Sequence, residues 1–246
     1  MSKKVNIAII IPCYNEQDNI VALYCELNNT IFPENYHVVP VYVNDCSIDN
    51  SKQLLIENNI THINLPVNLG IGGAVQSGFK YALKNGFDIA VQMDGDGQHP
   101  PGELHKILTP LIESKADVVI GSRYITKEGF QSSQLRRLGI NYFKNLNRCL
   151  TGITVNDSTS GYRALNKKAL ELVSEYYPDE YPEPESIVLY ALNNLKIKEV
   201  PVFMRERQSG KSSIRHYKTI YYMFKVTLGT IFLYIRLKFN GKRHFI

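Results

Sequence analysis

The feature that most constrains the fold is a regular alternation of short β-branched runs with segments of helical periodicity. The runs cover residues 5–11, 38–43, 60–65, 89–93 and 118–120. They are separated by helical patterns at 16–29, 47–58, 72–84 and 101–113. Continuous Val and Ile runs are typical of strands buried on both faces, and their alternation with helices is typical of a mainly parallel sheet. The sequence therefore predicts an α/β fold whose ligands bind at the carboxyl ends of the strands.

The pattern is looser in the second half of the chain. Helices are predicted at residues 135–150, 186–195 and 216–239, with one further strand at 198–204. The last of these helices has an apolar residue at every third or fourth position, which gives it one apolar face. The sequence therefore predicts two parts, an α/β domain of residues 1–214 and a basic amphipathic helix within residues 215–246.

Charge is distributed unevenly along the chain. Twelve of the 28 Lys and Arg residues lie from residue 196 onward with only two acidic residues, so this tail carries a formal charge of +10 and the preceding residues −5. A uniformly basic protein would suggest nucleic acid, whereas an acidic body with a basic, aromatic tail suggests phosphates or an anionic membrane surface. The four cysteines lack metal-ligand or disulfide-scaffold spacing, and no signal-peptide pattern is present, so we expect a reduced, cytoplasmic protein.

The fourth predicted strand ends in two carboxylates separated by one glycine. These are Asp94 and Asp96, and they are followed by Gly97, Gln98 and a proline-containing turn. Mg²⁺ and Mn²⁺ prefer hard oxygen ligands and are commonly held by one or two carboxylates together with substrate phosphates. The position of this pair at the end of a buried strand predicts a divalent metal site that acts on a phosphorylated substrate.

Other polar or small residues follow the second and third strands. Asp45 is an acceptor that suits a nucleobase or a ribose hydroxyl, whereas Asp49 is expected to cap the next helix. The glycines that begin at Gly70 allow a ligand to approach the backbone closely. Their spacing is not that of a dinucleotide-binding loop and they do not follow the first strand, so we reject a dehydrogenase of the Rossmann type.

Seven short motifs occur in order along nearly the whole chain. They are IPCYNE at 11–16, VNDCSID at 43–49, NLGIG at 68–72, DGDGQ at 94–98, GSR at 121–123, SGYR at 160–163, and EVP at 199–201 followed by RQSGKS at 207–212. In this order they resemble the family 2 glycosyltransferases of GT-A fold, particularly the branch that includes dolichyl-phosphate mannose synthases and bacterial polyprenyl-phosphate glycosyltransferases. The resemblance implies an enzyme with a mainly parallel central sheet flanked by helices.

The resemblance implies a nucleotide-diphosphate sugar, either a UDP-sugar or a GDP-sugar, as the donor. The residues that would contact this donor are Pro12, Tyr14, Glu16, Asp45, Gly70, Asp94 and Gln98. Asp94 and Asp96 would act on the diphosphate with Mg²⁺ or Mn²⁺, and Asp96 would be the direct ligand. Arg207 and Lys211 would close on the phosphates. A metal and cationic side chains at a departing diphosphate lower the barrier to its release.

Two kinds of acceptor remain open. A lipid phosphate, such as a polyprenyl phosphate, is already ionised and needs a cationic site, for which the resemblance implies Arg123 and the sequence also offers Arg163. A sugar hydroxyl needs a carboxylate to take its proton, and the candidates are Asp157, Glu183 and Glu185. In either case the resemblance implies a single displacement that inverts the anomeric configuration.

The final helix suggests how the protein meets a membrane. Its apolar stretch is too short to span a bilayer, which favours a helix in the plane of the interface with its basic residues at anionic headgroups. Packing of the helix on its own domain or on a second copy of the chain, as a homo-oligomer, is the alternative. A separate small membrane protein that supplies an anchor would be a further partner. We expect the protein at the cytoplasmic face of the membrane.

Two other classes of function agree with parts of the sequence. A sugar-nucleotide pyrophosphorylase would carry a Gly-rich, Arg-containing loop after the first strand, and residues 12–16 contain neither Gly nor Arg. A catalytically silent, membrane-associated binding module would retain the fold, and the intact pair Asp94 and Asp96 argues against it.

Overall fold

The structure, a computed structural model, describes residues 4–126, 134–206 and 216–239. Within these ranges the chain forms one seven-stranded sheet with the strand order β3-β2-β1-β4-β6-β5-β7. The strands are β1 (Val5–Cys13), β2 (Tyr36–Asn44), β3 (His62–Asn64), β4 (Ile89–Gln92), β5 (Val118–Ser122), β6 (Arg163–Asn166) and β7 (Ile197–Pro201). Every neighbouring pair is parallel except the two pairs that involve β6, so the sheet is mainly parallel, as predicted.

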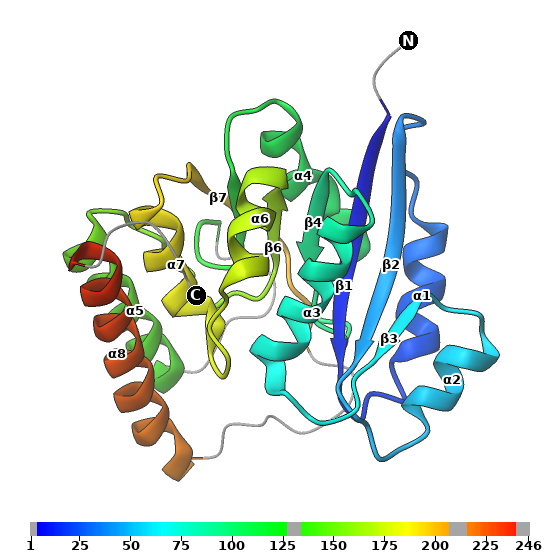
Figure 1. Cartoon of the computed structure of the whole chain (residues 1–246), viewed down its shortest axis with the longest axis horizontal. Helices are drawn as coiled ribbons and strands as arrows, with labels where there is room; N and C mark the ends of the chain where they lie inside the picture. Colours follow the sequence, from blue (N-terminus) through cyan, green and yellow to red (C-terminus); the bar gives the residue numbers. More distant parts are fainter. Residues whose placement is uncertain (1–3, 127–133, 207–215, 240–246) are drawn as a thin grey trace.

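Helices cover both faces of this sheet (Figure 1). They are α1 (Ile20–Asn29), α2 (Ser51–Glu57), α3 (Gly70–Lys84), α4 (Leu104–Ile112), α5 (Gln134–Thr151), α6 (Lys167–Glu175), α7 (Pro182–Leu192) and α8 (His216–Phe239), with a short 3₁₀ turn at Pro101–Glu103. The side chains of a strand alternate between the two faces, so β1 sends Ile7 and Ile9 to a core under α1, α2 and α4, and Ala8 and Ile10 to a core under α3, α6 and α7. The Val and Ile runs of the sequence are therefore strands buried on both faces.

The insertion of antiparallel β6 between β4 and β5 is the main feature that the sequence did not predict. Arg163, the first residue of β6, pairs with Gln92 near the carboxyl end of β4 and with Ile120 of β5. The segment that precedes β6 therefore lies at the same edge of the sheet as the segments that follow β4 and β5. The following helix, α6, was also not predicted.

Several element bounds differ from those predicted. The first helix begins at Ile20 rather than near residue 16, and β3 has only three residues. Helix α7 begins at Pro182, before the predicted 186–195, because proline fits the first turn of a helix, where its missing N–H costs nothing. The predicted final helix, 216–239, is confirmed as α8.

Helix α8 lies at the outer end of the molecule, beside α5 and α7 (Figure 1). Leu233 and Leu237 of α8 join the core that lies under α3 and α6, and Val226 is fully buried. The predicted division at residue 214 falls outside the described residues. In the described part of the chain, no helix is both long enough and apolar enough to cross a membrane.

Candidate active site

The acidic turn after β4 is held in place by backbone contacts and by one buried histidine. The N–H of Asp94 donates to Nδ1 of His99 at 3.1 Å, and Gly97 takes a left-handed backbone conformation with φ of 75°. The N–H of Gln98 donates to a carboxylate oxygen of Asp96 at 3.0 Å. Asp96 is nearly buried, whereas the side chain of Asp94 is 37% exposed. The two carboxylates therefore project from one tight turn at the edge of the sheet.

His99 is part of this turn, and no role was predicted for it from the sequence. Its ring stacks on Tyr162 with the ring centroids 4.6 Å apart. Burial lowers the pKa of His99 to about 4, so the imidazole is neutral at physiological pH. Because Nδ1 accepts the N–H of Asp94, the proton of the neutral ring lies on Nε2, which is 3.8 Å from a carboxylate oxygen of Asp94.

The carboxylate of Asp94 packs against Gly161, in the space that a side chain at this position would fill. A Cβ atom at this position would lie 2.9 Å from one carboxylate oxygen of Asp94 and 3.2 Å from Nε2 of Gln92. That amide donates to Oε1 of Glu183 at 3.3 Å, and its own oxygen accepts the hydroxyl of Tyr177 at 3.2 Å. Burial raises the pKa of Glu183, and the charge of Asp94 adds to this effect. Of the three carboxylates considered as a general base, Glu183 is thus the one whose surroundings include Asp94.

The donor atoms of the acidic turn fit a divalent cation that also binds phosphate. Among the described residues, no group of three or more His, Cys, Asp and Glu side chains could enclose a metal ion. Asp94 and Asp96 offer two hard carboxylates on a glycine turn, and the carboxylate of Asp94 fits against Gly161, where a Cβ would displace it. Mg²⁺ and Mn²⁺ are commonly bound by only one or two carboxylates and complete their coordination with water and phosphate oxygens. The residues therefore fit the predicted metal.

The predicted donor contacts at the ends of β1 and β2 lie close together. Tyr14 is 48% exposed, just after β1. The N–H of Glu16 donates to Ser51 at 3.0 Å, and its carboxylate accepts the amide of Asn19 at 2.6 Å. Pro12 pairs with Val43 of β2, and its carbonyl oxygen would lie 3.1 Å from a Cβ at Gly95, which brings the end of β1 against the acidic turn.

Asp45 and Gly70, both predicted to contact the donor, contact each other. The two carboxylate oxygens of Asp45 accept the backbone N–H groups of Leu69 and Gly70 at 2.7 and 2.9 Å. Asp45 is 3% exposed, and it satisfies two N–H groups at the start of α3. This structural role was not predicted. Asp49, predicted to cap the next helix, lies one residue before the N-cap residue, Asn50, and its carboxylate accepts the N–H of Ser51, the first residue of α2, at 2.9 Å.

Arg163 does not lie where an acceptor could reach it, and this prediction is corrected. The residue is fully buried, and its guanidinium donates only to oxygen atoms of the protein. Its partners are the carbonyls of Ser158, Ser160 and Glu183 and the hydroxyl of Ser186, at 2.6 to 3.0 Å. Arg163 therefore joins the segment before β6 to the first turn of α7, and its role is structural.

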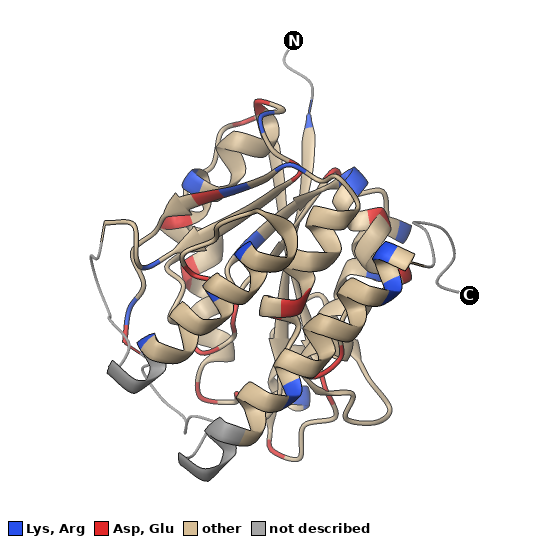
Figure 2. Cartoon of the chain, turned by 90° about the vertical axis from the view of Figure 1, so that its left-hand side faces the viewer, with Lys and Arg blue, Asp and Glu red and all other residues tan. Residues whose placement is uncertain are grey.

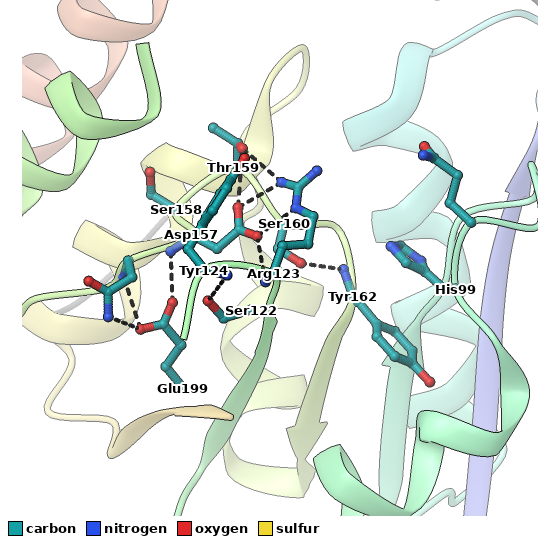
Figure 3. A network of polar contacts seen from close by, with 12 residues as sticks. His99, Ser122, Arg123, Tyr124, Asp157, Ser158, Thr159, Ser160, Tyr162 and Glu199 are labelled. Atoms are coloured by element: carbon teal, nitrogen blue, oxygen red, sulfur yellow. Dashed lines mark hydrogen bonds and ion pairs between the residues drawn. The ribbon is translucent and has the colours of Figure 1, made fainter. Parts of the chain in front are cut away.

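Asp157 forms a buried ion pair with Arg123, so the prediction that it acts as a base is also corrected. Nε and Nη2 of Arg123 each donate to a different oxygen of Asp157 at 2.7 Å (Figure 3). The backbone N–H of Arg123 donates to the same carboxylate at 3.1 Å. Asp157 is fully buried and Arg123 is 6% exposed. A carboxylate held by three donors of one arginine is not available to take a proton from a sugar hydroxyl.

Glu185, the other weak candidate for catalysis, faces α8. A Cβ at Gly229 of α8 would lie 2.6 Å from Oε1 of Glu185, so the carboxyl group lies directly on this helix. Burial, with a contribution from the charges of Asp179 and Glu180, raises the pKa of Glu185 to about 7, although Lys225 opposes the shift. Glu185 therefore belongs to the contact between α7 and α8, and the prediction of a catalytic role is not supported.

Arg207 and Lys211 lie outside the described residues. The chain that leads to them is described as far as residue 206, and it lies beside the acidic turn. The N–H of Arg205 donates to the carbonyl of Gln98 at 2.9 Å, and Nε2 of Gln98 donates to the carbonyl of Arg205 at 3.3 Å. The guanidinium of Arg205 forms two hydrogen bonds with Glu26 of α1. Gln98 thus connects the acidic turn to the start of the cationic segment.

A mainly parallel sheet with one antiparallel strand, flanked by helices and carrying an acidic turn at its carboxyl edge, defines the GT-A class. The profile described as Glycosyl transferase family 2 matches residues 8–173. The chain is 32% identical over 247 aligned residues to the UDP-N-acetylglucosamine–dolichyl-phosphate N-acetylglucosaminyltransferase of Methanococcus voltae, over 91% of this chain and 89% of that protein. It is 31% identical to the polyprenol monophosphomannose synthase of Mycolicibacterium smegmatis, over 89% of this chain and 84% of that protein.

A solved structure supports the same fold. Glucosyl-3-phosphoglycerate synthase from Mycobacterium tuberculosis, in complex with Mn²⁺, UDP-glucose and glycerol 3-phosphate, superimposes with a TM-score of 0.68 at 17% identity, over 94% of this chain and 80% of that chain. The chain therefore belongs to glycosyl transferase family 2, and it is a glycosyltransferase of GT-A fold.

We predict that Gly161→Ala lowers the rate of sugar transfer roughly 10- to 100-fold, because the new methyl group would displace the Asp94 carboxylate and small errors of placement are costly at a reacting centre. The rate is measured under saturating substrates, together with the thermal unfolding midpoint. Gly102→Ala is the matched control, since a Cβ at Gly102 meets nothing within 4 Å. Equal rates for Gly161→Ala and the unmodified chain would contradict this role for Gly161.

A second prediction concerns the pH dependence of stability. The pKa of Glu185 is about 7 in the folded chain, above its usual value of 4.5. Between these two pH values the folded state therefore holds a proton that the unfolded state has lost. Stability at this site is therefore fully present below about pH 4.5 and falls as the pH rises through 7. We expect Glu185→Gln to raise the unfolding midpoint at pH 8 and to change it little at pH 5.

Differential scanning calorimetry at the two pH values measures this effect. Glu175→Gln, at an exposed position of α6, serves as the control and should give the same small change at both values. An equal shift for Glu185→Gln at pH 5 and pH 8 would show that the carboxyl group of Glu185 does not titrate as described.

Proposed function

We propose that this glycosyltransferase moves a sugar from a nucleotide-diphosphate donor to a polyprenyl phosphate at a membrane surface. The observation that carries the proposal is that the acidic turn after β4, with Asp94 and Asp96, and the buried Arg123 after β5 lie at the same edge of the sheet. The charge of Asp94 acts on Arg123, so the two groups are electrostatically close. Such a site offers carboxylates for a metal bound to the donor and a cation for an ionised acceptor.

The donor side of the proposal rests on Asp94 and Asp96. These carboxylates would hold Mg²⁺ or Mn²⁺, which would neutralise charge on the diphosphate as it leaves. The Mycobacterium tuberculosis synthase of the same fold was crystallised with Mn²⁺ and UDP-glucose, which supports this assignment. Tyr14 and Glu16, after β1, would contact the nucleoside, and Arg207 and Lys211 would bind the phosphates. Arg205 and Gln98 position the start of that cationic segment.

The acceptor side rests on Arg123 and on the names of two relatives. One of them is a dolichyl-phosphate N-acetylglucosaminyltransferase and the other a polyprenol monophosphomannose synthase. A lipid phosphate needs no general base, which agrees with the use of Asp157 in a buried ion pair. An oxygen of the lipid phosphate attacks the anomeric carbon, and the bond from that carbon to the donor diphosphate breaks. The nucleoside diphosphate leaves with the electron pair, and the configuration is inverted.

A sugar hydroxyl is the second acceptor that a specific observation favours. Glu183 lies beside Gln92, and burial, together with the charge of Asp94, raises the pKa of its carboxyl group, which makes the carboxylate a stronger base than an exposed one. With such an acceptor, Glu183 would receive the hydroxyl proton. Glu183→Gln separates the two mechanisms. It would abolish transfer to a hydroxyl, but it would leave transfer to a lipid phosphate in place, because that acceptor needs no general base.

The exposed side of α8 is the basis for placing the enzyme on a membrane. Large apolar side chains at least 38% exposed follow one another at helical spacing along α8, namely Tyr221, Phe224, Leu228, Phe232, Ile235 and Phe239. Leu138 and Tyr142 of the neighbouring α5 are 67% and 40% exposed. We call these eight residues the apolar face. Lys and Arg positions, blue in Figure 2, lie at the end of α8 nearest the carboxyl terminus. The basic residues of its last turn are Arg236 and Lys238. An amphipathic helix with aromatic and basic residues suits an anionic interface.

The first prediction of this proposal is metal-dependent turnover. Purified protein is offered UDP- and GDP-sugars with Mn²⁺ and a polyprenyl phosphate, and the release of nucleoside diphosphate is measured. We expect turnover that a chelator removes, and a loss of at least about 100-fold in Asp96→Asn, because a neutral amide is a poor ligand for a hard cation. Asp18→Asn, at an exposed position, is the control. Undiminished turnover in Asp96→Asn, or in the presence of a chelator, would contradict the proposed mechanism.

The second prediction concerns the membrane. Replacing Phe224 and Phe232 together by serine should weaken sedimentation with anionic liposomes about tenfold or more at low salt, because two aromatic rings no longer enter the interface. The double variant Ile31→Ser and Val67→Ser removes exposed apolar residues elsewhere and should sediment normally. If the α8 variant instead turns a dimer into a monomer and leaves sedimentation unchanged, the apolar face is a contact between two copies of the chain.

A further inference from the structure

We propose that Asp157 is a positioning residue for Arg123: it holds the guanidinium in the orientation that binds the phosphate of the acceptor. The inference rests on the proposed function, in which Arg123 contacts a lipid phosphate, and it assigns Asp157 a role other than that of a general base. It predicts that the negative charge of Asp157 contributes to acceptor affinity, even though the acceptor never touches this carboxylate.

The first argument is the geometry of the pair. Asp157 contacts one edge of the guanidinium, through Nε and Nη2, both at 2.7 Å. A planar guanidinium that is held along one edge cannot rotate, so the direction of its third nitrogen is fixed as well. In Figure 3 this nitrogen points away from Asp157. The hydroxyl of Thr159 lies 3.4 Å from Nη2 of Arg123 and 3.4 Å from an oxygen of Asp157, so it contacts both members of the pair.

The second argument is that Asp157 itself is anchored to the sheet. Its backbone N–H donates to Oε1 of Glu199, a residue of β7, at 2.7 Å. The other carboxylate oxygen of Glu199 accepts the backbone N–H and the side-chain amide of Asn156 at 2.9 and 2.8 Å. Lys144 of α5 donates to the oxygen of that amide at 2.7 Å. The carboxylate that orients Arg123 is thus fixed relative to β5 and β7, and it cannot follow the arginine if the arginine turns.

The third argument is electrostatic. Burial opposes the charge on Arg123, but the hydrogen bonds and the charge of Asp157 outweigh it, and the pKa of Arg123 is raised. The buried cation is therefore permanent, and the hydrogen bonds and charge of Asp157 stabilise it. A long side chain that is already ordered loses less conformational entropy when it binds, so the pair prepares Arg123 for a phosphate before the phosphate arrives.

The test compares two variants that disturb the same network in different ways. Asp157→Asn removes the charge that faces Arg123, whereas Glu199→Gln weakens the anchoring of the same segment without touching Arg123. Steady-state rates are measured with a sugar nucleotide and a short-chain polyprenyl phosphate, and KM is determined for each substrate separately. We expect Asp157→Asn to raise the KM for the acceptor about tenfold and to leave the KM for the donor unchanged. Glu199→Gln should lower the unfolding midpoint, raise the KM for the acceptor clearly less than Asp157→Asn does, and leave the KM for the donor unchanged.

A double variant tests whether Asp157 acts through Arg123. Arg123→Ala alone should raise the KM for the acceptor, and adding Asp157→Asn should raise it no further, because there is no guanidinium left to orient. Additive effects would overturn the inference, as would a normal acceptor KM in Asp157→Asn or an equal rise in Glu199→Gln. If the unmodified chain turns over no polyprenyl phosphate, the proposed function fails instead.

A milder variant keeps the test decisive if Asp157→Asn does not fold. Thr159→Val removes a hydroxyl that contacts both members of the pair and leaves their two short hydrogen bonds intact. We expect a two- to threefold rise in the KM for the acceptor, with the KM for the donor and the unfolding midpoint almost unchanged. An acceptor KM equal to that of the unmodified chain in this variant would count against the inference.

Discussion

The candidate site depends on where antiparallel β6 enters the sheet. A parallel strand in that position would have its amino end at the opposite edge, and the segment before it could not reach the acidic turn. Because β6 runs against β4 and β5, its first residue, Arg163, pairs with Gln92 and Ile120 close to the ends of those strands. Asp157, Gly161 and Tyr162 are thereby brought beside the residues that follow β4 and β5. The site is thus assembled from three segments that are distant in sequence, and the sheet fixes their relative positions.

Burial of charge then decides what each residue at this edge can do. An ionised group taken out of water must be matched by hydrogen bonds or by an opposite charge. Arg163 is matched on several sides by three carbonyl groups and a hydroxyl, and this leaves it a structural role. Arg123 is held along one edge by two hydrogen bonds to the carboxylate of Asp157, which fix the direction of its guanidinium. Two arginines at the same edge of the sheet therefore have different roles, and the arrangement of their partners accounts for the difference.

The sequence predicted those parts of the molecule that depend on local chemistry. Val and Ile runs predicted β1, β2, β4 and β5, because burial on both faces demands such residues, and the strand-end position of Asp94 and Asp96 indicated a shared turn. Strand β6 was missed because its sequence, RALN, contains no β-branched residue and its arginine is wholly buried. The roles of Asp157, Arg163 and Asp45 could not be predicted either. Each depends on at least one partner 20 or more positions away, such as Asp157, which lies 34 positions after Arg123, and no local pattern encodes these contacts.

Helix α7 joins the candidate site to the apolar face. Its first turn carries Glu183, which lies beside Gln92 and near Asp94, and also Glu185, which lies on Gly229 of α8. Just before it, Glu180 binds Lys225 of α8, and Tyr181 meets Tyr222 edge to face with ring centroids 4.5 Å apart. A lipid whose phosphate reaches Arg123 must have its chain in the membrane, so the site needs a fixed position relative to the surface that contacts the bilayer. Because the same turn of α7 contacts both the last residue of β4, just before the acidic turn, and α8, a membrane bound at α8 would lie at a set position relative to the site.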